Sequence, residues 1–159
     1  MSKESSTFSS TCGLCGAAFL LRLWVAVRLL GAGFAKFRDP SEAHGYSMDA
    51  YKTLMGNIAQ VQADNTFMPL AMTKPYSLIL PWVLISLGFW LLIGAGRQLG
   101  LFLAGATFLS LCVGVTALPD DTQSLYLGLH VGLCAAALAV SKYDCLSLDG
   151  LLGRFSKKN

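Results

Sequence analysis

Four apolar stretches of nearly membrane-spanning length constrain the fold of this chain most strongly. They cover about residues 16–35, 76–93, 99–118 and 125–141, and a helix needs roughly 20 residues to cross the hydrocarbon layer. Short polar links join the last three, so these helices are expected to be antiparallel neighbours. We predict an all-α integral membrane protein, a four-transmembrane-helix bundle.

The composition leads to the same class of protein. Hydrophobic residues make up 54% of the 159 residues and charged residues 13%, whereas soluble domains average about 25% charged residues. The net charge is +3, and no basic stripe with interleaved aromatic residues indicates a nucleic-acid partner. Residues 1–15 are polar and are expected to form a disordered tail. The first apolar stretch is too long for a cleavable signal and contains arginines, so we expect it to be retained.

The first connection, residues 36–75, is much longer than the others. Apolar side chains recur within it at helical spacing over about residues 48–62, which predicts an amphipathic helix. Two interpretations stay open: a helix lying in the membrane interface or capping the bundle, and an ordinary surface helix of a small extramembrane cap.

Lysine and arginine residues near the span ends predict the orientation. The side with both termini carries Lys3, Arg97, Lys142, Arg154, Lys157 and Lys158, and the other side carries Lys36, Arg38, Lys52 and Lys74. We expect an integral protein of a bacterial inner membrane with both termini in the cytoplasm.

Two arginines interrupt the first apolar stretch, and a charge near the bilayer centre costs roughly 2.5–3.5 kcal/mol on insertion scales. Arg22 lies near the cytoplasmic end, where snorkelling explains it. Arg28 lies seven residues before Ala35, on the order of 10 Å from the other surface. No span contains an acidic residue, so the expected partner of Arg28 is the backbone, a hydroxyl such as Ser110 or Thr107, or a bound group.

One polar or polarizable side chain from each span falls at a similar depth: Arg28, Trp82, Cys112 and His130. Arginine and histidine can donate to carbonyl or anionic oxygens, tryptophan can stack, and histidine exchanges protons near neutral pH. We predict that Arg28, His130 and Trp82 bind the head group of a quinone or lipid; a small oxyanion is also compatible. In the alternative, His130 bonds a neighbouring helix and Arg28 bonds backbone groups.

The spacing around His130 indicates a further alternative. Gly128 and Gly132 form a GxxxG pattern that lets another helix approach, and His130 points roughly to the opposite side. If the glycines face the bundle, His130 faces lipid or another subunit.

The cysteines give weaker signals. Cys12 and Cys15 form a CxxC just before the first span, and Cys145 follows the fourth. These three are weak candidates for a metal site, which lacks a fourth ligand, and the CxxC is a weak candidate for a redox dithiol. The favoured interpretation is inert thiols beside the membrane, while Cys112 and Cys134 pack as small apolar residues.

Three segments resemble the DoxX/DoxD family of small membrane proteins. They are RLWVAVRLLGAGFAKFRD at 22–39, GFWLLIGAGRQLGLFLAG at 88–105 and YDCLSLDGLL at 143–152. The resemblance implies a compact four-span bundle; DoxD is a subunit of a thiosulfate:quinone oxidoreductase. It also places Arg22, Arg28 and Lys36 on family-like basic positions, and Ser147 and Asp149 on a closing motif.

The closing motif also has a physical interpretation. Ser147 and Asp149 are suited to the start of a short interfacial helix in the C-terminal tail, residues 142–159. Asp149 is alternatively placed to pair with Arg97.

Together these observations predict a DoxX-like membrane subunit of a quinone-linked redox complex, not catalytic alone. It would bind quinone without a covalent cofactor and contact lipids and other membrane or peripheral subunits. The alternative is a non-catalytic scaffold or accessory subunit that fills a helix seam in a larger assembly. With His44 in the first loop, bis-histidine haem in the bundle is disfavoured.

Overall fold

The computed structural model describes residues 2–39, 45–66, 68–116 and 121–144, with side chains from residue 13 onward except at 116 and 121. These residues form helices and no strand. In chain order the helices are α1 (Ser2–Ala35), α2 (Met48–Asn65), α3 (Leu70–Ile93), α4 (Arg97–Thr116), α5 (Asp121–Val140) and the 3-10 turn η1 (Ser141–Tyr143).

Four segments are long and apolar enough to cross a membrane: Gly13–Ala35, Leu70–Ile93, Arg97–Val115 and Thr122–Tyr143. Many of their large apolar side chains are exposed, among them Leu20 on α1, Ile79 and Phe89 on α3 and Phe102 on α4. An outward apolar surface of this kind suits lipid rather than water. The chain is therefore an integral membrane protein, and the predicted four-helix membrane bundle is confirmed.

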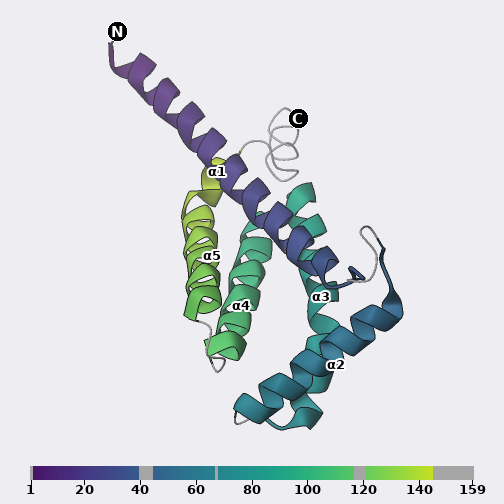
Figure 1. The fold of residues 1–159 in the computed structure, drawn as a ribbon. Coiled ribbons are helices and arrows are strands. Elements are labelled where there is room, and N and C mark those ends of the chain that lie inside the picture. Colours follow the sequence, from purple (N-terminus) through teal and green to yellow (C-terminus); the bar gives the residue numbers. More distant parts are fainter. Residues whose placement is uncertain (1, 40–44, 67, 117–120, 145–159) are drawn as a thin grey trace.

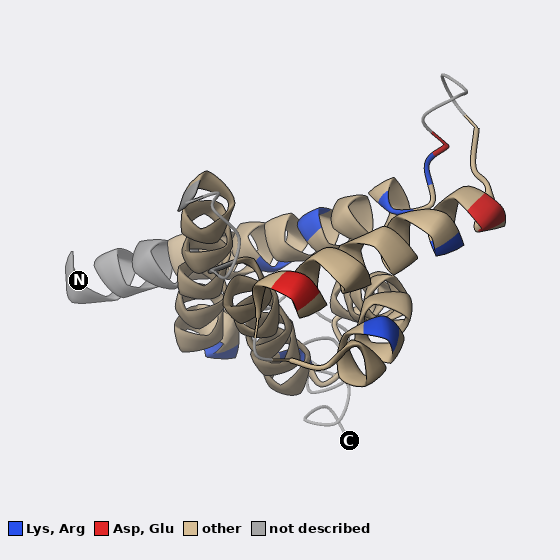
Figure 2. Ribbon diagram, turned by 60° about the horizontal axis from the view of Figure 1, so that its bottom comes forward, with Lys and Arg blue, Asp and Glu red and all other residues tan. Residues whose placement is uncertain are grey.

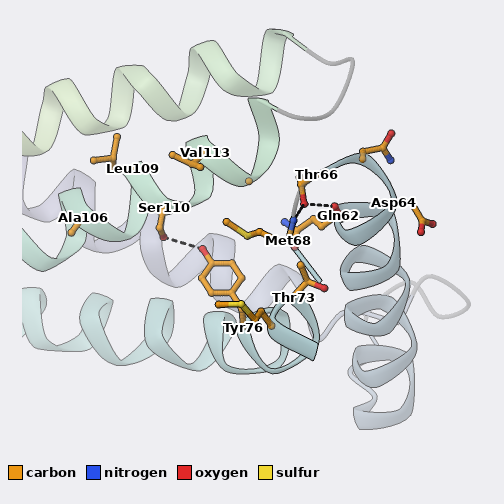
Figure 3. A pocket seen from close by; sticks show the side chains of 13 residues that line it. Gln62, Asp64, Thr66, Met68, Thr73, Tyr76, Ala106, Leu109, Ser110 and Val113 are labelled. Carbon is orange, nitrogen blue, oxygen red and sulfur yellow. Dashed lines mark hydrogen bonds between the residues drawn. The ribbon is translucent and has the colours of Figure 1, made fainter. Parts of the chain in front are cut away.

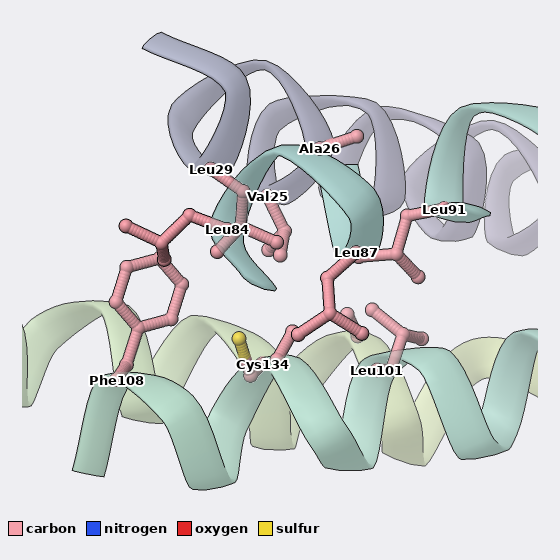
Figure 4. Close-up of a cluster of buried hydrophobic side chains, with 11 residues drawn as sticks. Val25, Ala26, Leu29, Leu84, Leu87, Leu91, Leu101, Phe108 and Cys134 are labelled. Carbon is pink, nitrogen blue, oxygen red and sulfur yellow. The ribbon is translucent and has the colours of Figure 1, made fainter. Parts of the chain in front are cut away.

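The spans pack in an order set by small residues and short turns. α1 crosses α3 obliquely, and α4 and α5 lie side by side (Figure 1). A Cβ atom on Gly88 of α3 would approach Leu30 Cγ to 2.7 Å, so this glycine allows α1 and α3 to meet. Side chains from all four spans fill the core (Figure 4), namely Val25, Ala26, Leu29, Leu84, Leu87, Leu91, Leu101, Ala104, Phe108, Cys134 and Ala137.

Several element boundaries differ from those expected. α1 begins at Ser2, so the expected disordered tail, residues 1–15, is helical from that residue on. A helix that the apolar span has nucleated extends at little cost per residue. α3 begins at Leu70 rather than near residue 76 and contains Pro75 and Pro81. Of the C-terminal tail, only the part up to Asp144 is described, so Ser147 and Asp149 lie outside the described residues.

The expected helix of the long connection is present as α2 and extends three residues further, to Asn65. Ser47 caps its N-terminus: the Ser47 hydroxyl accepts from the Ala50 amide at 3.3 Å. Its buried residues, Tyr51, Met55 and Ala59, belong to the face that packs on α3. α2 lies across the end of α3 that is away from the N-terminus (Figure 1), so it caps the bundle.

Candidate functional site

Arg22 is buried at the end of the bundle where α3 finishes. Its side chain is 3% exposed, and its Nε donates to the Asp144 carboxylate at 2.7 Å. Its Nη1 donates to the carbonyl oxygens of Leu91 at 2.5 Å and Leu92 at 3.2 Å. These carbonyls belong to the last turn of α3, which has no helical partners for them. Arg22 therefore caps α3 and pairs with the segment after α5.

The expectation that Arg22 snorkels to the surface is wrong. No span contains an acidic residue, but Asp144 follows the fourth span directly and packs against α1. Arg97, at the start of α4, donates to the backbone oxygen of Asp144 at 3.1 Å. The two arginines thus join the described ends of α3, α4 and α5 to α1, and this cluster is structural.

Arg28 differs from Arg22 in both its exposure and its contacts. It lies on the exposed side of α1, and within the described part of the chain it has no hydrogen bond or ion pair. Neither Ser110 nor Thr107 is in contact with it: the Ser110 hydroxyl bonds the Thr107 carbonyl and the Tyr76 hydroxyl, and the Thr107 hydroxyl bonds the Leu103 carbonyl. The acidic residues seen in Figure 2 lie on α2 and in the segment leading to it.

His130 is buried between α4 and α5, with 7% of its surface exposed. Its ring lies 5.2 Å from that of Phe108. Nδ1 lies 2.6 Å from the Tyr126 carbonyl, which can only accept, so Nδ1 donates this hydrogen bond. No described residue donates to Nε2. Gly128 and Gly132 face outward, with nothing within 4 Å of an added Cβ, so it is His130 that points into the bundle.

The other residues of the predicted layer are also separate. Trp82 is 49% exposed and meets Phe37 edge-on at 5.1 Å, while Phe37 stacks on Tyr51 at 4.4 Å. Cys112 contacts Ser124 at 3.7 Å. No contact among the described residues joins Arg28, Trp82 and His130, so their shared role as a head-group site stays a prediction.

Cys15 is disulfide-bonded, so the expectation of an inert free thiol is wrong at this position. Cys112 and Cys134 are free, and Cys134 is buried. Within the described ranges, no three His, Cys, Asp or Glu side chains gather as metal ligands. The candidates Cys12 and Cys145 lie outside the described side chains.

A pocket of about 960 Å³ opens where the end of α2, the start of α3 and the second half of α4 meet. Gln62, Asp64 and Thr66 lie at one end, and Ala106 and Leu109 lie toward the other (Figure 3). The remaining lining residues are Asn65, Met68, Met72, Thr73, Tyr76, Ser110, Val113 and Gly114. The volume is near the upper end of the roughly 300–1,000 Å³ typical of ligand sites.

Most polar groups lining this pocket already have partners. The Ser110 hydroxyl donates to the Thr107 carbonyl at 2.8 Å, so the Tyr76 hydroxyl, 2.9 Å away, donates to Ser110 Oγ. Thr66 Oγ1 donates to the Gln62 carbonyl at 2.6 Å, and Thr73 Oγ1 to the Ala59 carbonyl at 3.0 Å. The hydroxyl groups that line the pocket therefore already donate their hydrogen bonds to protein groups.

Gln62 is the exception. Its Oε1 accepts from the Ser77 hydroxyl at 3.4 Å, but its Nε2 makes no hydrogen bond within the described residues. That nitrogen lies 3.1 Å from the position of a Cβ atom on Gly114, so the amide reaches from α2 to α4. The amide oxygen therefore has Ser77 as a partner, and the amide nitrogen has none within the described residues.

Family models, curated proteins and solved structures were compared with the chain. No match was found. The DoxX/DoxD resemblance therefore stays a prediction.

The pocket could not be predicted from the sequence, because its lining comes from three elements and contains few ionisable groups. One local signal was available. Residues 65–73, Asn-Thr-Phe-Met-Pro-Leu-Ala-Met-Thr, combine polar and flexible apolar side chains directly before a span. Such a segment is suited to the boundary between water and lipid.

Proposed function

We propose that this chain is a membrane subunit that binds the head group of a quinone in the pocket between α2, α3 and α4. The observation that carries the proposal is the Gln62 amide, whose Nε2 is unpaired within the described residues and lies at the polar end of an otherwise apolar pocket. A quinone carbonyl accepts the hydrogen bond that this amide offers.

The charge of the pocket favours a neutral head group over a phosphate. Asp64 is the one charged residue among the described lining residues, and its carboxylate repels phosphates and carboxylates. A quinone carries no charge, and the hydroxyl groups of its reduced form can donate hydrogen bonds to a carboxylate. The apolar stretch from Met72 to Leu109 is suited to the isoprenoid tail.

The place of the pocket in the bundle suits a lipid-soluble ligand. α2 covers the end of α3 (Figure 1), so polar Gln62 lies near the water boundary. Exposed Met72, Leu109 and Val113 border lipid in a membrane. In the orientation predicted from the basic residues, with both termini in the cytoplasm of a bacterial cell, the ligand would enter from the outer leaflet. Electrons for reduction of the quinone would be supplied by a partner subunit.

The proposal is tested by quinone binding to the purified full-length chain in lipid nanodiscs. We expect decyl-ubiquinone to bind, and Gln62→Leu to raise the dissociation constant roughly 3- to 10-fold, the effect of one hydrogen bond. Ala106→Trp, which fills the apolar end from an exposed position, should abolish binding.

Gln123→Leu provides the matched control, because Gln123 is exposed at the start of α5 and does not line the pocket. Its dissociation constant should equal that of the unmodified chain. If Gln62→Leu and Ala106→Trp bind decyl-ubiquinone as tightly as the unmodified chain does, the proposal is wrong. Effective competition by phosphatidylglycerol would also contradict it.

A further inference from the structure

We propose that a disulfide bond joins Cys15 to Cys145 and fastens the segment after η1 to α1, and that this end of the bundle faces an oxidising compartment. In a bacterial inner membrane this is the periplasmic side. The quinone pocket plays no part in this inference, because it lies between α2, α3 and α4 and neither cysteine lines it.

The structure restricts the partner of Cys15 to two residues. Cys15 is disulfide-bonded. The chain has five cysteines, and Cys112 and Cys134 are free. The remaining candidates are Cys12 and Cys145, whose side chains lie outside those that the structure describes.

Helix geometry disfavours Cys12 as the partner. α1 runs without interruption from Ser2 to Ala35, so Cys12 and Cys15 are three residues apart in the interior of a helix. Cβ atoms at this spacing are about 5–6 Å apart, whereas the Cβ atoms of a disulfide are only about 3.5–4.5 Å apart. A bond between these two residues would therefore require α1 to be distorted.

The position of Asp144 favours Cys145. Asp144 Oδ2 accepts from Arg22 Nε at 2.7 Å, and a helical side chain such as that of Arg22 tilts toward the N-terminus of its helix, which is the direction of Cys15. Cys15 lies seven residues before Arg22, about two turns or 10 Å along the axis and on nearly the same face. Ala18, between them, is 2% exposed, so this face of α1 is covered up to the turn next to Cys15.

A single further residue of chain covers the remaining distance. A Cα step is about 3.8 Å, and the Cα atoms of a disulfide are up to about 6.8 Å apart. Together with the length of the Arg22 side chain, these exceed the roughly 10 Å between Arg22 and Cys15 along α1. Cys145 directly follows Asp144, so it is within reach of Cys15.

The disulfide indicates on which side of the membrane this end of the bundle lies. Disulfides persist in oxidising compartments and are rare in the cytosol. The bond forms when the two thiols pass two electrons and two protons to the disulfide of an oxidant in that compartment, which leaves as a dithiol. The inferred orientation reverses the one predicted from the basic residues, where six cations on one side against four on the other are only a small excess. α2 and the pocket, at the other end of α3, would then lie on the cytoplasmic side.

Counting free thiols in the full-length chain tests the pairing. Membranes are quenched with acid, the chain is unfolded in sodium dodecyl sulfate, and a maleimide that carries polyethylene glycol shifts the gel band once for each free thiol. With one disulfide among five cysteines, we expect three labels before reduction and five after it. Cys145→Ser frees Cys15 and should give four labels without reduction. Cys12→Ser keeps the disulfide and should give two, as should the matched control Cys112→Ser at a free cysteine.

A second measurement tests the side of the membrane. In the Cys12→Ser chain, one further cysteine replaces an exposed lysine, either Lys142→Cys in η1 or Lys52→Cys in α2. Each change removes one cation, so the two variants are matched. An impermeant maleimide is added to intact spheroplasts, and labelling is compared with that of Cys12→Ser alone. We expect additional labelling of Lys142→Cys, and of Lys52→Cys only after the membrane is permeabilised.

Three results would overturn the proposal. Five labels on the unmodified chain before reduction would show that Cys15 is a free thiol. Four labels in Cys12→Ser and two in Cys145→Ser would show that the partner of Cys15 is Cys12. If intact spheroplasts label Lys52→Cys but not Lys142→Cys, the end of the bundle with Cys15 faces the cytoplasm and the inferred orientation is wrong.

Discussion

The ion pair between Arg22 and Asp144 provides the sharpest test of the fold. Asp144→Asn keeps the shape of the side chain and removes its charge. The hydrogen bonds of Arg22 include one to Asp144 and two to the carbonyls of Leu91 and Leu92. The variant weakens the first, worth roughly 1.5–3 kcal/mol for a charged pair, and removes the carboxylate charge that faces the buried guanidinium. Because two carbonyls remain, we expect a loss of about 2–4 kcal/mol, at or below the usual cost of breaking a buried pair.

The assay is unfolding of the full chain in mixed micelles by increasing fractions of sodium dodecyl sulfate, followed by tryptophan fluorescence. Asp64→Asn makes the same chemical change at an exposed site and should alter stability by less than about 0.5 kcal/mol. The double variant Arg22→Met/Asp144→Asn removes the buried guanidinium charge as well and should recover part of the loss. If Asp144→Asn lowers the free energy of unfolding by no more than Asp64→Asn does, this ion pair does not hold the ends of the helices together.

Three further predictions concern other parts of the fold. Gly88→Ala places a Cβ 2.7 Å from Leu30 Cγ and should cost about 1–3 kcal/mol of unfolding free energy. Gly132→Ala, with open space around it, should change the unfolding free energy by no more than about 1 kcal/mol. Equal effects of the two variants would show that the close approach of α1 and α3 is misassigned. His130→Leu removes the unpaired Nε2 and should leave stability unchanged or higher in the same detergent assay; a large loss would indicate a partner for that nitrogen. Burial raises the pKa of the Tyr51 phenol above 10.0, more than the hydrogen bond involving Trp82 lowers it. The folded state therefore keeps this proton longer, so stability should fall as pH rises above about 10, and the Tyr51→Phe variant measured at the same pH values should lose less.

The presence of the membrane helices could be predicted from the sequence because each span is a local signal. Apolar length alone identified four of them, and the spacing of apolar residues identified α2. The positions of the helix ends were predicted less accurately. A proline at position 75 favours the end of a loop in the sequence, whereas it lies inside α3, since a membrane helix accommodates proline where other groups satisfy the freed carbonyl.

The orientation of side chains could not be predicted, because depth along a helix does not give rotation about its axis. Arg22 and Arg28 lie on one helix with similar neighbours, yet one is buried against a residue 122 positions away and the other is exposed. The same uncertainty affected His130, whose flanking glycines face outward. The pocket depends on contacts among three elements, so no single segment could reveal it.

Photolabelling with a quinone tests directly whether the pocket between α2, α3 and α4 binds the quinone head group. A photoreactive azidoquinone is added to the full-length chain in lipid nanodiscs, illuminated, and its attachment points are located by mass spectrometry. We expect labels at Met68, Met72 and Gln62, and protection by excess decyl-ubiquinone. Labels confined to α1 around Arg28 or to α5 around His130, or labelling that excess quinone does not reduce, would contradict the assignment of the pocket.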